Sequence, residues 1–108
     1  MIKRLAIIPA RAGSKRVKNK NIKNFFTKPL IYNSLMAAKK SKLFSKIHVS
    51  TESELIKKKV ENLGFKIDFM RDKNLSDDKT SISKVISHVL KKYSELNEKF
   101  YEIWLIYA

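Results

Sequence analysis

The chain has 108 residues, no cysteine and a formal net charge of +14 at pH 7. This length suits a single domain, and the lack of cysteine excludes disulfides and thiolate metal sites. The apolar run near the amino terminus is too short for a signal peptide or a membrane span. We therefore expect a cytoplasmic protein with no membrane partner.

The positive charge lies mainly in the first half of the chain. Residues 1–51 hold 13 Lys and Arg and no acid, whereas residues 52–108 hold 11 bases and 10 acids. Such asymmetry indicates a polyanionic partner. The sequence has no helix-turn-helix, RNP aromatic pair or zinc pattern, so nucleic acid is not the expected partner. A basic, non-catalytic protein that binds nucleotides or RNA is the alternative to an enzyme.

The first elements alternate between strand and helix. Leu5–Pro9 is a continuous apolar run ended by proline, which predicts a strand buried on both faces. Pro29 suits the first turn of a helix, and an apolar stripe from Leu30 to Ala38 continues it. Residues 47–50 predict the second strand.

A second helix and a third strand are expected next. Thr51 and Glu54 have capping-box spacing, and helical periodicity follows as far as Leu63. Gly64 stands where a left-handed residue would end that helix. Phe65–Met70 alternates as a third strand.

The last part of the chain predicts one more helix and one more strand. The clearest amphipathic pattern follows Thr80, at Ile82, Val85, Ile86, Val89, Leu90 and Tyr93. Ile103–Tyr107 is a fourth apolar run. The order predicts a single α/β domain over residues 1–108, with a Rossmann-like parallel sheet of about four strands and flanking helices.

In such sheets ligands bind beyond the carboxyl ends of the strands. Three segments are expected there: the loop from Ala10, the Ser50-Thr51 turn and Arg71–Ser81. The first reads Ala-Arg-Ala-Gly-Ser-Lys-Arg-Val-Lys-Asn-Lys-Asn and ends at Asn21. Its small residues and cations suit a triphosphate. The loop has neither Walker A spacing nor a dinucleotide fingerprint.

The motif Ile-Pro-Ala-Arg-Ala-Gly-Ser-Lys-Arg, followed by Lys20-Asn21, resembles the signature of the sugar-acid cytidylyltransferases. These enzymes make CMP-activated nonulosonic acids such as CMP-N-acetylneuraminate and CMP-pseudaminate. Weaker similarities lie at Pro29-Leu30, Val49–Thr51, Arg71 and residues 75–81. The resemblance covers all 108 residues, but only about the first half of such an enzyme.

This resemblance implies a fold of the nucleotide-diphospho-sugar transferase type, truncated after about four strands. It implies transfer of CMP from CTP to a nonulosonic acid, with release of pyrophosphate. Mg²⁺ would be the cofactor, held by ligands outside this chain, and the full-length form would be a homodimer. The product would serve capsule, lipopolysaccharide or flagellin glycosylation. As a fragment, the isolated chain is expected to be poorly active or inactive.

Catalytic roles on the CTP phosphates are implied by the resemblance for Arg11 and Lys20. The implied CTP-binding set is Ala10, Arg11, Ala12, Gly13, Ser14, Lys20, Asn21, Arg71 and Ser81. Two members have alternative roles. Arg71 could form a salt bridge with Asp68 or Asp72, and Ser81, or Thr80 beside it, could cap the following helix.

Asp77 and Asp78 form an adjacent carboxylate pair that suggests Mg²⁺. Acids just before a helix also favour its amino-terminal dipole, and this role is sufficient. We therefore assign no metal-binding residue. His48, inside a strand, and His88, near the apolar side of a helix, are expected to be structural.

Overall fold

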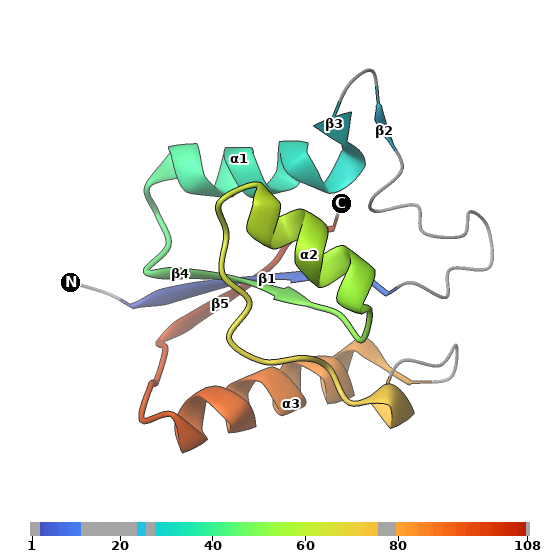
Figure 1. Cartoon of the computed structure of the whole chain (residues 1–108). Helices are drawn as coiled ribbons and strands as arrows, with labels where there is room; N and C mark the ends of the chain where they lie inside the picture. Colours follow the sequence, from blue (N-terminus) through green and yellow to red (C-terminus); the bar gives the residue numbers. More distant parts are fainter. Residues whose placement is uncertain (1–2, 12–23, 26–27, 76–79, 108) are drawn as a thin grey trace.

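The computed structural model describes residues 3–11, 24–25, 28–75 and 80–107 (Figure 1). It is an α/β domain in which helices lie on both sides of one small sheet. Its elements, in chain order, are β1 (Arg4–Pro9), β2 (Asn24–Phe25), β3 (Lys28–Pro29), α1 (Leu30–Ser41), β4 (Lys46–Ser50), α2 (Glu54–Asn62), the 3₁₀ turn η1 (Lys73–Leu75), α3 (Ile82–Glu95) and β5 (Glu102–Leu105).

The main sheet has three parallel strands in the order β4-β1-β5, so the first strand is the central one. β1 pairs with β4 from Leu5↔Lys46 to Pro9↔Ser50, and with β5 from Arg4↔Glu102 to Ile7↔Leu105. Both pairings are parallel, as the alternation of strands and helices predicted. β2 and β3 form a separate antiparallel ribbon.

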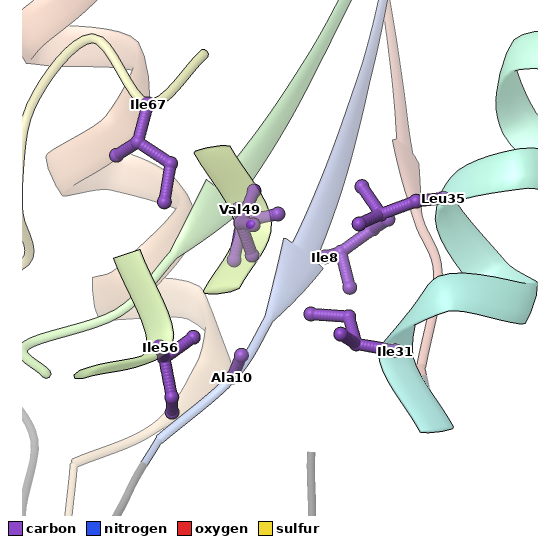
Figure 2. Packing of buried hydrophobic residues seen from close by; sticks show 8 residues of the cluster. Ile8, Ala10, Ile31, Leu35, Val49, Ile56 and Ile67 are labelled. Atoms are coloured by element: carbon purple, nitrogen blue, oxygen red, sulfur yellow. The ribbon is translucent and has the colours of Figure 1, made fainter. Parts of the chain in front are cut away.

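The face of the sheet that α1 and α2 cover carries the larger core cluster (Figure 1). Figure 2 shows side chains of β1 and β4 between those of α1 on one side and of α2 and the segment after it on the other. The cluster consists of Ile8, Ala10, Ile31, Leu35, Val49, Ile56, Val60 and Ile67.

The opposite face packs against α3. Leu5 and Ile7 of β1 meet Val89 and Tyr93 of α3, and all four are fully or almost fully buried. Successive β1 residues therefore enter opposite cores. This two-sided burial explains why the strand reads as an uninterrupted apolar run.

The prediction of a third strand over Phe65–Met70 is wrong, because none of these residues is in a strand. The parallel sheet accordingly has three strands among the described residues, not about four. The segment crosses from α2 to α3, and its side chains reach both cores: Ile67 packs in the α1/α2 cluster and Phe69 in the α3 cluster. A crossing of this kind gives the same two-residue alternation as a strand.

The helix ends also differ in detail from the predictions. α2 is capped by Ser53, whose hydroxyl accepts a hydrogen bond from the Ile56 N–H at 3.2 Å. Thr51 is not the cap; its hydroxyl accepts from the Ser53 N–H instead. Pro29 is the last residue of β3, and α1 begins at the next residue.

The predicted end of α2 is confirmed. Gly64 has a φ of +94°, and its N–H donates to the Glu61 carbonyl at 3.0 Å. The Phe65 N–H reaches back to the Val60 carbonyl at 3.3 Å. These two bonds form a Schellman motif, which needs a left-handed residue at the glycine position.

Candidate functional site

The carboxyl ends of β1 and β4 are tied together where the candidate residues lie. Pro9 and Ser50, the last residues of the two strands, are partners in the sheet. Beyond them, the Ala10 N–H donates to the Ser50 carbonyl at 2.9 Å, and the Arg71 N–H donates to the Thr51 carbonyl at 2.7 Å. The structure thus brings together the start of the basic loop, the Ser50-Thr51 turn and Arg71.

Among the described residues, Ser50 is the one that holds the guanidinium of Arg71. Its Nε donates to the Ser50 hydroxyl and its Nη2 to the Ser50 carbonyl, both at 3.0 Å. Only 6% of Arg71 is exposed. In the described part of the chain, these two hydrogen bonds to the serine hold the side chain, rather than the alternative of a salt bridge with Asp68 or Asp72.

Two cations are close enough at this edge to affect one another. Burial lowers the pKa of Arg71, Glu52 opposes that effect, and the positive charge of Arg11 adds to it. Arg11, which follows β1, is half-buried. An anion placed between two such cations would relieve their repulsion. The edge is therefore electrostatically suited to phosphate.

The rest of the predicted loop lies outside the described residues. It comprises the CTP-binding candidates Ala12, Gly13, Ser14, Lys20 and Asn21. Asp77 and Asp78 also lie outside them. Of the predicted set, the structure places Ala10, which is fully buried, Arg11, Arg71 and Ser81.

Ser81 caps α3, as its alternative role required. Its hydroxyl accepts a hydrogen bond from the Lys84 N–H at 3.3 Å, and the residue is exposed at the helix amino terminus. The hydrogen bond satisfies one of the N–H groups that a helix start leaves without a partner. The contact of Ser81 with cytosine stays a prediction.

A buried polar network between β4 and α3 was missed by the sequence analysis. The Tyr93 hydroxyl donates to an Asp68 oxygen at 2.9 Å and lies 3.2 Å from His48 Nδ1. Because the hydroxyl has one proton, we assign His48 Nδ1 as the donor to Tyr93. Lys46 extends the network, with its Nζ 3.3 Å from Asp68 and 2.7 Å from Glu98.

Burial controls the protonation of this network. It lowers the pKa of His48 to about 4, although the carboxylate of Asp68 favours the charged ring. Burial alone would raise the pKa of Asp68, but the hydrogen bond from Tyr93 and the charge and hydrogen bond of Lys46 together outweigh it, so the pKa falls. His48 is thus a neutral structural histidine, as predicted. The signal for the network was a tyrosine in the apolar stripe of α3, whose hydroxyl needs a polar partner.

His88 also belongs to the packing around α3. Its ring lies 6.0 Å from the Phe69 ring, and its Nε2 is 3.6 Å from an Asp72 carboxylate oxygen. Burial lowers the pKa of His88, whereas Asp72 favours its charged form. The ring is therefore held mainly by packing, in agreement with the structural role predicted for it.

The described residues do not assemble a site for a divalent metal. No group of three or more His, Cys, Asp or Glu in that part of the chain could hold an ion. The sequence resemblance implies Mg²⁺ ligands outside this chain, so the Mg²⁺ requirement stays a prediction. Within the same residues, no helix is long and apolar enough to cross a bilayer.

The fold is of the α/β type in which a parallel sheet carries its ligand site at the carboxyl ends of the strands. Within this class, the chain belongs to the cytidylyltransferase family, whose pattern matches residues 5–101.

Two relatives illustrate the family. The chain is 39% identical over 107 residues to the pseudaminic acid cytidylyltransferase of Campylobacter jejuni, a match that covers 99% of this chain. It is 40% identical over 92 residues to the N-acylneuraminate cytidylyltransferase of Escherichia coli, with 84% of this chain covered.

Among solved structures, the CMP:2-keto-3-deoxy-manno-octonic acid synthetase complexed with CTP matches 97% of this chain. The TM-score is 0.79 and the sequence identity is 23%, so this likeness concerns the fold. The chain spans 46% of the length of the Campylobacter relative, 22% of the Escherichia relative and 39% of the solved synthetase chain.

Proposed function

We propose that the protein binds CTP at the carboxyl edge of its sheet and serves the transfer of CMP to a nonulosonic acid. The observation that carries this proposal is the convergence of Arg11 and Arg71 at the ends of β1 and β4. Membership of the cytidylyltransferase family supports the nucleotide. The names of the relatives support the class of acceptor, because one acts on pseudaminic acid and another on N-acylneuraminate.

In the proposed reaction, an anomeric hydroxyl oxygen of the sugar acid attacks the α-phosphorus of CTP. The new bond joins that oxygen to phosphorus, the bond between the α-phosphorus and the bridging oxygen breaks, and pyrophosphate leaves with the electron pair. The hydroxyl proton is lost to solvent or a base. Charge grows on the phosphoryl oxygens and on pyrophosphate, so fixed cations such as Arg11, Lys20 and Arg71 would stabilise the transition state.

We further propose a Mg²⁺ requirement, a cytoplasmic location and a homodimeric full-length form. Divalent ions commonly neutralise the phosphates of a nucleotide. Because the described residues assemble no group of three or more His, Cys, Asp or Glu, we assign the ion no ligand here. The product would be a CMP-activated sugar acid for capsule, lipopolysaccharide or flagellin glycosylation.

The nucleotide part of the proposal is tested by the base preference of the 108-residue chain. Calorimetric titration and thermal shift should show tighter binding of CTP than of ATP or GTP. Equal binding of all three would contradict a cytidine site. A single-stranded RNA should not displace CTP. If RNA does displace CTP, and does so much less well as the salt concentration rises, the chain is an RNA-binding protein instead.

A further inference from the structure

Ser50 contacts Arg71 through both of its oxygen atoms. The hydroxyl accepts from Nε and the carbonyl from Nη2, and Ser50 itself is 1% exposed. Hydrogen bonds to a charged group in a buried setting are stronger than those between neutral groups. Ser50 is therefore the main polar anchor of this guanidinium among the described residues.

Because of the shape of the guanidinium, the two hydrogen bonds to Ser50 also fix its orientation. The group is planar and carries five N–H donors in a fixed fork. Ser50 occupies the edge that contains Nε and one side of Nη2, so the other N–H groups point away from Ser50. The backbone N–H of Arg71 is also bound, to the Thr51 carbonyl. Both ends of the side chain are thus fixed.

The same serine also fixes the segment that carries Arg11. Its carbonyl accepts from the Ala10 N–H as well as from Arg71 Nη2. One residue thereby sets the position of the basic loop's first residues relative to the guanidinium. Because the two cations are held at this edge before a ligand binds, less ordering is needed when a phosphate binds between them.

We propose that Ser50 is a positioning residue for the triphosphate of the nucleotide: it holds Arg71 with the outer edge of its guanidinium directed to the phosphates, next to Arg11. This inference rests on the proposed function, because it assumes that the carboxyl edge receives a polyphosphate. Ser50 itself need not touch the ligand. Its effect on binding should pass through Arg71.

The first test compares Ser50→Ala with Ser50→Thr in the full 108-residue chain. Binding of CTP and of inorganic tripolyphosphate is titrated under conditions where each variant is fully folded. Loss of the hydroxyl anchor should weaken both ligands by about tenfold, the effect of losing one charge-assisted hydrogen bond. The threonine variant keeps the hydroxyl and should bind within about twofold of the parent chain, allowing for the scatter among such effects.

A matched control is available at the other end of β4. Ser45 is exposed and its hydroxyl accepts from the Arg4 N–H at 3.3 Å. Ser45→Ala should leave the affinity for both ligands unchanged. If it weakens them as much as Ser50→Ala does, the effect comes from general loosening of the strand and the inference is wrong.

A double-mutant cycle separates positioning from a purely structural role. Arg71→Ala should weaken tripolyphosphate, and adding Ser50→Ala should then cause little further loss, because its effect passes through the missing guanidinium. Additive losses would overturn the inference. Should Ser50→Ala fail to fold, Arg71→Lys takes its place. That variant keeps a charge without the fork and should lose about as much affinity as Arg71→Ala; full affinity would overturn the inference.

The two ligands keep this inference distinct from the proposed function. If the parent chain binds tripolyphosphate and shows no preference for CTP, the proposed function fails while the role of Ser50 is still measured. If CTP binds and neither Ser50 variant changes its affinity, the inference fails and the function stands. If neither ligand binds, both are overturned.

Discussion

Arg11 and Lys20 are the side chains on which the proposed function depends most directly. Each is expected to make a charge-assisted contact with the CTP phosphates, worth about 1.5–3 kcal/mol of binding free energy. Arg11→Ala and Lys20→Ala should therefore weaken CTP binding by that amount in a calorimetric titration. The free energy of unfolding, measured with urea, should change little.

The control for these two variants is a lysine that lies away from the carboxyl ends of the strands, on the side where β4 begins. Lys39 is exposed in the last turn of α1, where its Nζ lies 5.8 Å from the centre of the Phe65 ring. Lys39→Ala should leave CTP binding unchanged. An equal loss in all three variants would mean that CTP responds only to the overall positive charge.

The lowered pKa of His48 predicts how the stability of the folded chain depends on pH. A histidine in the unfolded chain has a pKa near 6.5, whereas burial lowers the pKa of folded His48 to about 4. Between these values the unfolded state binds a proton that the folded state does not. Stability should therefore fall as the pH drops from 6.5 to 4, by up to about 3 kcal/mol. Urea unfolding at a series of pH values measures this loss.

The variant His48→Asn identifies the source of that loss. The asparagine amide can still donate to Tyr93 but does not titrate. The folded chain should thus lose much less stability over the same pH range. The lowered pKa of His88 leaves a smaller loss in the same direction, and that of Asp68 adds to it only toward the acidic end of the range. An unchanged pH profile in this variant would show that His48 is not the main titrating group.

At the scale of elements, substitutions of Ser81 at the start of α3 distinguish its two roles: the cap of the helix and the predicted contact with cytosine. Removal of the capping oxygen in Ser81→Ala should cost about 1 kcal/mol of stability. Ser81→Asp keeps a capping oxygen and should restore most of it. If Ser81 also contacts cytosine, both variants should weaken CTP binding, since neither has the hydroxyl. If the aspartate variant binds CTP as tightly as the parent chain, Ser81 caps the helix and does not contact cytosine.

The helices and the buried strand were predictable because their patterns have one dominant cause. β1 is apolar from Leu5 to Pro9 because both of its faces are covered. α3 carries a regular apolar stripe because one of its faces is covered. Phe65–Met70 was misread because alternation does not distinguish a strand from a segment that crosses between two cores. The β2–β3 ribbon has two residues in each strand, too few to produce a periodic signal.

The candidate site was predictable only as far as the chain order determines it. The parallel topology placed Ala10 and Ser50-Thr51 at one edge, and the structure joins them. Arg71 was expected there as the end of a third strand; no strand precedes it, and the hydrogen bond from its N–H to the Thr51 carbonyl brings it to that edge. The partner of the Arg71 guanidinium could not be predicted, because it depends on side-chain geometry across 21 residues of sequence. The network of His48, Asp68 and Tyr93 depends on equally distant contacts.

For the whole molecule, we expect CTP binding without efficient catalysis by the 108-residue chain. The relatives that carry the enzyme names are longer, and this chain spans 46% of the Campylobacter protein. Pyrophosphate release should be measured with CTP, Mg²⁺ and a panel that includes pseudaminic and N-acetylneuraminic acids. Turnover of about 1 per second or faster would show that these residues contain a complete catalytic site.

The central position of β1 has a consequence for the order in which the molecule is made. The central strand β1 is synthesised before both of its neighbours in the sheet, and Arg4 meets its partner Glu102 only 98 residues later. Contacts between such distant residues slow folding, because a long loop must close before they form. β1 therefore leaves the ribosome before the other strands of its sheet and waits longest for its second neighbour. During that interval a nascent chain is most exposed to chaperones and to aggregation.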